Sequence, residues 1–78
     1  MSAEAPVTFS TFLVSLASTA LAHLGRAEGV DVPVDPRLAR DTLAVLDLLA
    51  AKTKGNLEPE EARLLDALQR ELRGALPR

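Results

Sequence analysis

The absence of cysteine is the feature that most constrains what this chain of 78 residues can fold into. Without cysteine, neither a disulfide nor a thiolate metal site stabilises a domain this short. The single histidine, His23, does not supply the several ligands that a zinc site needs, so we expect no metal and no cofactor. The remaining sources of stability are good helix packing and oligomerisation.

Residue composition favours an all-α fold. Apolar residues make up 47% of the chain, whereas aromatic residues make up only 3% and consist of Phe9 and Phe12. The core must therefore be built from leucine, alanine and valine, and Leu and Ala are the strongest apolar helix formers. The net charge of −2 gives the chain as a whole no bias toward nucleic acid or anionic lipid.

The first predicted helix covers residues 8–24. Thr8 or Ser10 is a suitable N-cap, and Gly25 stands where a glycine commonly follows a helix. Residues 1–7 predict a flexible N-terminus, and residues 26–35 predict a connecting loop because they lack helical periodicity. We therefore expect a single helical domain over residues 8–76.

The second and third predicted helices form a hairpin. Asp35 followed by Pro36, and Glu58 followed by Pro59, are typical helix starts, and Gly55 ends the second helix. A short loop between two amphipathic helices produces an antiparallel pair. The predicted apolar stripes are Leu38, Thr42, Val45, Leu46 and Leu49 on the second helix, and Leu65, Leu68, Leu72 and Leu76 on the third.

Two stretches of the chain are typical of one known family. They are FSTFLVSLASTALAHLG (residues 9–25) and KTKGNL (residues 52–57), the second of which precedes an acidic helix start. The chain resembles a small bacterial family catalogued as domain of unknown function 1844, over nearly its whole length. It departs from the family at Glu58 and Pro59, where members more often carry threonine followed by acidic residues. The resemblance implies no established activity and assigns no functional residue.

The first predicted helix is unusual because residues 5–25 contain no Asp, Glu, Lys or Arg. A helix on the surface of a monomer normally has a charged face. We therefore expect this helix to lie between its own hairpin and a second subunit, so that oligomerisation completes the small core. The predicted interface is the apolar arc of this helix: Phe9, Phe12, Leu13, Leu16, Ala17, Ala20, Leu21 and Leu24.

Three alternatives for this segment stay open. The first alternative is that it docks on or enters a membrane. Its length approaches the roughly 20 residues that span a bilayer, although it lacks a flanking aromatic belt or basic cluster. Residues 20–22 resemble a signal-peptidase site, although Glu4 and no basic residue precede the apolar run. The third alternative is a monomer that presents the helix to a different protein. We favour a homo-oligomer, or an unidentified protein partner, in the cytoplasm.

Arginines gather at one end of the predicted hairpin, because the start of its first helix lies beside the end of its second. This end is a candidate site for an acidic partner or a nucleic-acid backbone. Nearby acidic residues favour a solvated surface instead, and Asp66 and Arg70 stand four residues apart as a stabilising pair. The arginines concerned are Arg37, Arg40, Arg70, Arg73 and Arg78.

His23 falls within the apolar arc of the first helix. A functional interpretation makes it a pH switch or a ligand, but no second ligand or base is visible nearby. We therefore expect its ring to pack and its nitrogen to meet a carbonyl or water. No Ser-His-Asp, Cys-His or metal-ligand arrangement is present, so we expect a non-catalytic oligomerisation or interaction module. The alternative is an accessory protein that contacts a membrane or nucleic acid.

Overall fold

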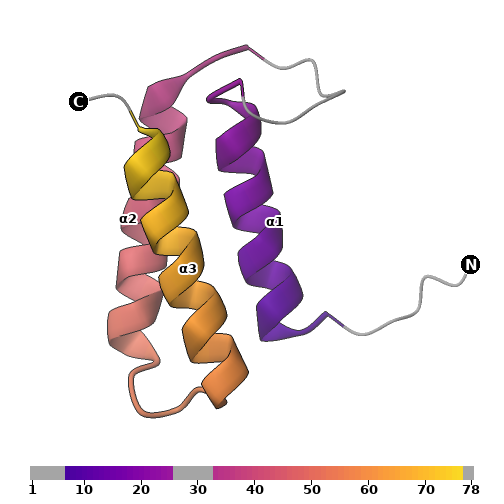
Figure 1. The fold of residues 1–78 in the computed structure, drawn as a ribbon, viewed down its shortest axis with the longest axis vertical. Helices are drawn as coiled ribbons and strands as arrows, with labels where there is room; N and C mark the ends of the chain where they lie inside the picture. Colours follow the sequence, from indigo (N-terminus) through magenta and orange to yellow (C-terminus); the bar gives the residue numbers. More distant parts are fainter. Residues whose placement is uncertain (1–6, 26–32, 77–78) are drawn as a thin grey trace, which may run out of the picture.

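The computed structural model describes residues 7–25 and 33–76, which form three α-helices (Figure 1). They are α1 (Phe9–Ala22), α2 (Pro36–Lys52) and α3 (Pro59–Ala75). Consecutive helices run in opposite directions, and each helix packs against both of the others. The predicted all-α class and the C-terminal antiparallel hairpin are confirmed. The expected flexible N-terminus and connecting loop lie, apart from residues 7 and 33–35, outside the described residues.

Polar caps begin all three helices where the sequence predicts them. Of the two N-cap candidates for α1, Thr8 is the one used: the Thr11 N–H donates to Thr8 Oγ1 at 3.1 Å, and the Thr8 N–H donates to Thr11 Oγ1 at 2.9 Å. The Asp35 carboxylate accepts a backbone N–H from the first turn of α2 at 3.1 Å. At the start of α3, Glu61 Oε1 accepts the N–H of Glu58 at 2.9 Å. Each contact satisfies a donor that the helix itself leaves unpaired.

The helix α1 ends at Ala22, two residues before the predicted end. The N–H groups of Leu24 and Gly25 donate to carbonyls three residues back, Leu21 and Ala22, each at 3.0 Å, which tightens the last turn. Gly25 then reverses the chain with a φ of +75°, and Gly55 does so after α2 with a φ of +85°. Both glycines occupy a backbone conformation that other residues rarely adopt.

His23 fastens the end of α1 to the segment that leads into α2. Its Nδ1 donates to the carbonyl of Pro33 at 3.0 Å, and its own carbonyl accepts the N–H of Asp35 at 2.7 Å. The prediction that a His23 nitrogen meets a carbonyl is therefore confirmed. These two bonds hold the start of α2 beside the end of α1, and they set the antiparallel alignment of the two helices.

The core contains one fully buried leucine from each helix: Leu13, Leu46 and Leu72. Ala20 and Ala39, which are 1% and 0% exposed, belong to the same cluster and allow the helices to approach closely. The predicted stripe on α3 is confirmed, because Leu65 and Leu72 are buried and Leu68 and Leu76 pack against the cluster. The other partly buried apolar residues around it are Phe9, Leu16, Leu21, Leu24, Leu43, Leu49, Ala50, Leu57 and Leu64.

Candidate interaction surface

Most of the interface predicted on α1 is taken up by contacts within the chain itself. Leu13, Ala17 and Ala20 are 0%, 2% and 1% exposed in the single chain, so these three side chains do not reach a second molecule. Four others pack, partly buried, against the same core: Phe9, Leu16, Leu21 and Leu24. These positions therefore complete the core of the single chain with α2 and α3, and an interface through them stays a prediction. Phe12 alone among the eight predicted residues is exposed, at 42%.

Exposed large apolar side chains of the helices lie on α1 and α2. On α1 they are Phe12 and Val14, at 42% and 45% exposure. On α2 they are Leu38, Val45 and Leu48, at 42%, 40% and 56% exposure. Within the described residues α3 has none, and its outer side carries charged residues. The apolar side of the molecule is therefore formed by α1 and α2.

The position of Leu38 and Val45 corrects the predicted stripe on α2. Ala39 and Leu46, both 0% exposed, define the inward direction of this helix. Leu38 and Val45 each precede one of these residues, and they are therefore turned about 100° away from the core. Sequence reasoning missed the outward stripe because α2 contains two sets of apolar residues at helical spacing, and spacing alone does not say which set is buried.

Phe12 lies on the flank of α1 that faces α2. It precedes the buried Leu13 by one residue, which turns it about 100° to one side. Leu21 is turned to the opposite side, where it lines a hollow with Glu71 of α3. Because the Asp35 N–H is bonded to the His23 carbonyl, Phe12, eleven residues before His23, falls at about the level of Val45, ten residues after Asp35. We call Phe12, Leu38, Val45 and Leu48 the outer apolar surface.

Threonine hydroxyls beside this surface are bonded within their own helices. Thr42 Oγ1 donates to the carbonyl of Leu38 at 3.0 Å, and Thr11 Oγ1 donates to the carbonyl of Thr8 at 3.0 Å. A hydroxyl that already has a partner loses little when another surface covers it, whereas an unpaired one incurs its full desolvation cost. These hydroxyls therefore add little to the cost of covering the outer apolar surface.

The predicted arginine-rich end is partly neutralised by carboxylates. The predicted pair is confirmed, with Arg70 Nε 3.0 Å from Asp66 Oδ2 on the same helix. Arg73 also has a partner, since its Nη2 lies 3.1 Å from Asp47 Oδ2 on α2. The structure places Arg37 and Arg40 in the first two turns of α2, exposed at the same end of the hairpin. Arg78 lies outside the described residues.

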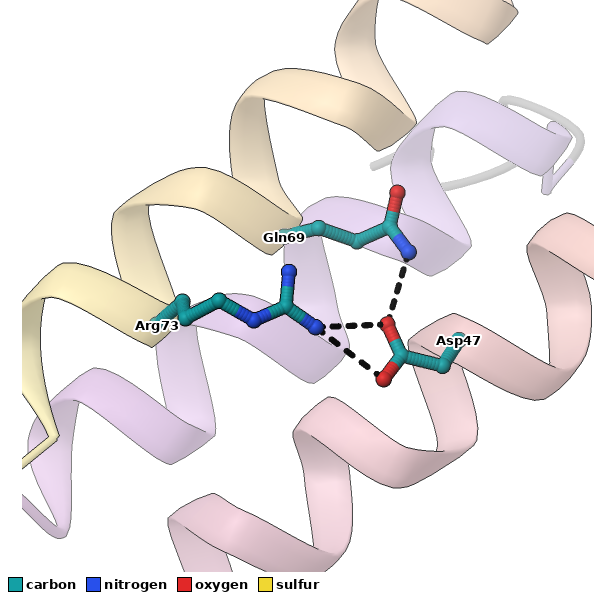
Figure 2. Close-up of polar contacts among 3 residues, drawn as sticks. All are labelled: Asp47, Gln69 and Arg73. Atoms are coloured by element: carbon teal, nitrogen blue, oxygen red, sulfur yellow. Dashed lines mark hydrogen bonds and ion pairs between the residues drawn. The ribbon is translucent and has the colours of Figure 1, made fainter.

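The carboxylate of Asp47 links α2 to α3 (Figure 2). It accepts hydrogen bonds from Gln69 Nε2 at 2.7 Å and from Arg73 Nη2 at 3.2 and 3.1 Å. Asp47 therefore marks the side of α2 that faces α3. Sequence reasoning missed this network because Gln69 and Arg73 stand 22 and 26 positions from Asp47 and meet it only through the alignment of the hairpin.

We expect this network to contribute modestly to the alignment of the hairpin. Replacing Asp47 and Arg73 with alanine, singly and together, should give a coupling free energy of about 0.2–1 kcal/mol, since both side chains are roughly half exposed. Urea denaturation of the four proteins measures it. The same cycle on Asp66 and Arg70 is the control, and should give about 0.3–0.5 kcal/mol. A coupling near zero for Asp47 and Arg73 would show that the contact does not stabilise the hairpin.

A shallow hollow of about 230 Å³ lies at the turn between α2 and α3. Its apolar lining includes Ala50, Leu57 and Leu65, and the rim includes Thr53 and Gln69. The hydroxyl of Thr53 donates to the Leu49 carbonyl at 2.6 Å, and Gln69 binds Asp47. Thr53 therefore helps to hold the end of α2, and Gln69 helps to hold the hairpin.

Membrane contact is one of the alternatives for α1. This helix has 14 residues, and within the described residues no helix is long and apolar enough to cross a membrane. A helix that lies in the membrane interface normally carries lysine or arginine on its polar face. Phe9–Ala22 contains neither.

The protein-family model described as Domain of unknown function (DUF1844) matches residues 6–77. The chain belongs to this family. The match covers α1, α2 and α3, so the outer apolar surface lies entirely within the DUF1844 domain. The resemblance of the two quoted stretches is thereby confirmed. No curated protein and no solved structure matches the chain.

Proposed function

We propose that this DUF1844 domain is a non-catalytic helical interaction module that self-associates through the outer apolar surface. One observation carries the proposal: four of the five exposed large apolar side chains of the helices, all except Val14, form the outer apolar surface on α1 and α2, while α3, within the described residues, has none. A monomer that exposes apolar side chains together on one side commonly uses that side to contact another protein.

The small core supports self-association. Each helix contributes one large side chain that is fully buried, and much of the apolar content of α2 is left outside. A domain of this size gains stability when an oligomer covers further apolar surface. The bonded threonine hydroxyls beside the surface lower the cost of covering it.

The proposal gives no catalytic role to His23 and no nucleic-acid role to the arginines. The Nδ1 atom of His23 is engaged with the Pro33 carbonyl at 3.0 Å. Arg70 and Arg73 already face carboxylates of the chain itself, which reduces the positive potential available to a phosphate backbone. The proposed setting is the bacterial cytoplasm, and this part rests on the resemblance to a bacterial family.

The test of this proposal is the solution mass from about 1 μM to about 1 mM, by size-exclusion chromatography with light scattering. We expect the mass to rise above the 8.3 kDa of one chain as the concentration increases. Val45→Ser should raise the concentration needed for association by roughly tenfold or more, because it removes apolar area from both copies.

Val14→Ser is the matched control. Val14 and Val45 are the same residue type at similar exposure, 45% and 40%, but Val14 is turned to the other flank of α1. We expect Val14→Ser to associate like the unmodified chain. A mass of 8.3 kDa at every concentration would overturn the proposed function.

A further inference from the structure

One ridge of α2 combines apolar and charged residues at the spacing of a helix–helix seam. Its members alternate three and four residues apart, and all are exposed: Leu38, Asp41, Val45, Leu48 and Lys52. At about 100° per residue they fall within an arc of about 80°. This spacing is the heptad pattern with which one helix packs along another.

The ridge is turned away from the rest of the chain. Asp47 points to α3, where it binds Gln69 and Arg73, and the ridge begins about 100° round the helix from Asp47. Ala39 and Leu46 mark the buried side of α2, and none of the ridge residues shares it. In the described part of the chain neither Asp41 nor Lys52 forms an ion pair.

We propose that this ridge packs antiparallel against the same ridge of a second copy of the chain, in a dimer with two-fold symmetry. The inference rests on the proposed function and names its partner and geometry. With the symmetry axis at the level of Leu46 and Asp47, Val45 meets Leu48 of the second copy. In the same register Asp41 meets Lys52 of the second copy, and the symmetry repeats each contact.

The charges select this arrangement over the alternatives. A parallel pair sets Asp41 against Asp41 and Lys52 against Lys52, so both charged layers repel. An antiparallel pair shifted by one heptad sets Asp41 against Val45, or Lys52 against Leu48, and leaves the charges without partners. Only the proposed register pairs both charges and also pairs Val45 with Leu48, while Leu38 falls opposite Gly55, beyond the end of α2. A ridge that complements itself in this way fits a second copy of the chain.

The size of the contact predicts its strength. One helix ridge from each copy forms a smaller interface than the standard protein–protein contact, even with Phe12 at its edge. We therefore expect a dissociation constant in the micromolar range, on the order of 1–100 μM. This range decides the concentrations at which the dimer must be measured.

Charge reversal tests the arrangement. Asp41→Lys places two lysines opposite each other in each charged layer, and Lys52→Asp places two aspartates there. We expect each single variant to dissociate at least about tenfold more readily than the unmodified chain, measured by sedimentation equilibrium. The double variant Asp41→Lys/Lys52→Asp should dimerise again. A mixture of the two single variants should form a one-to-one heterodimer, because every charged layer then pairs opposite signs.

The controls separate this inference from the proposed function. Arg63→Asp and Glu71→Lys reverse exposed charges on α3, and should leave the dimer unchanged. Far-ultraviolet circular dichroism verifies that every variant is folded. If the chain associates but both single reversals associate equally well, the antiparallel ridge is wrong and the proposed function stands. If the single variants dissociate and neither the mixture nor the double variant recovers, the pairing is likewise wrong. A chain that stays monomeric throughout overturns both.

Discussion

Leu46→Ala is expected to lower the free energy of unfolding by about 2–5 kcal/mol. Leu46 is 0% exposed and belongs to the core cluster that joins the three helices. Truncating it removes buried methyl groups and leaves a cavity that the two neighbouring helices close only in part. A chain of 78 residues has a total stability of about 4–12 kcal/mol, so this loss is a large fraction of it.

Urea denaturation followed by circular dichroism measures this effect, and Leu48→Ala is its control. The chemical change is identical and the two residues stand two positions apart, but Leu48 is 56% exposed. At concentrations below those of self-association, Leu48→Ala should change stability by about 0.5 kcal/mol or less. Equal losses in the two variants would contradict the inward direction assigned to α2.

The helix starts were predictable from local chemistry, whereas the predicted end of α1 was two residues too late. Thr8, Asp35 and Glu58 begin the helices as expected, because a cap involves residues only two or three positions away. Gly25 and Gly55 adopt positive φ where the sequence predicted helix ends. These signals depend on neighbours along the chain, so they do not require the fold to be known.

What covers each apolar stripe was not predictable in the same way. Periodicity on α1 identified Leu13 and Ala17 as apolar positions of one arc, but the same arc serves equally for an intramolecular core and for an interface. The structure places both residues in the core, at 0% and 2% exposure. On α2 the reverse happened, since Leu38 and Val45 were assigned to the inward stripe and are exposed.

Contacts across the hairpin show the same limit. The pair of Asp66 and Arg70 was predictable because both lie on one helix, four residues apart. The pair of Asp47 and Arg73 depends on how α2 and α3 are aligned relative to each other along their axes. That alignment follows from the packing of leucines between the helices, which no local pattern encodes.

Ala20→Glu is expected to unfold the chain, and it tests why α1 contains no charge. Ala20 is 1% exposed within the core cluster, where its small side chain allows close helix contact. A glutamate there overpacks the core, at about 1–3 kcal/mol, and also buries a carboxylate without a partner, at several kcal/mol more. The combined cost is comparable with the whole stability of a domain this size, about 4–12 kcal/mol. The loss of the helical circular dichroism signal measures it.

Ser18→Glu, on the exposed side of the same helix, separates two explanations of the uncharged segment. Ser18 is exposed in the single chain, so a glutamate there stays in water and should change stability by about 0.5 kcal/mol or less. If Ser18→Glu folds and Ala20→Glu does not, the core requires only the inner half of α1 to be uncharged. If both variants unfold, the outer half is also needed for folding, and the contacts within one chain are insufficient to explain α1. If both fold with unchanged stability, Ala20 does not occupy the tightly packed position that the structure gives it.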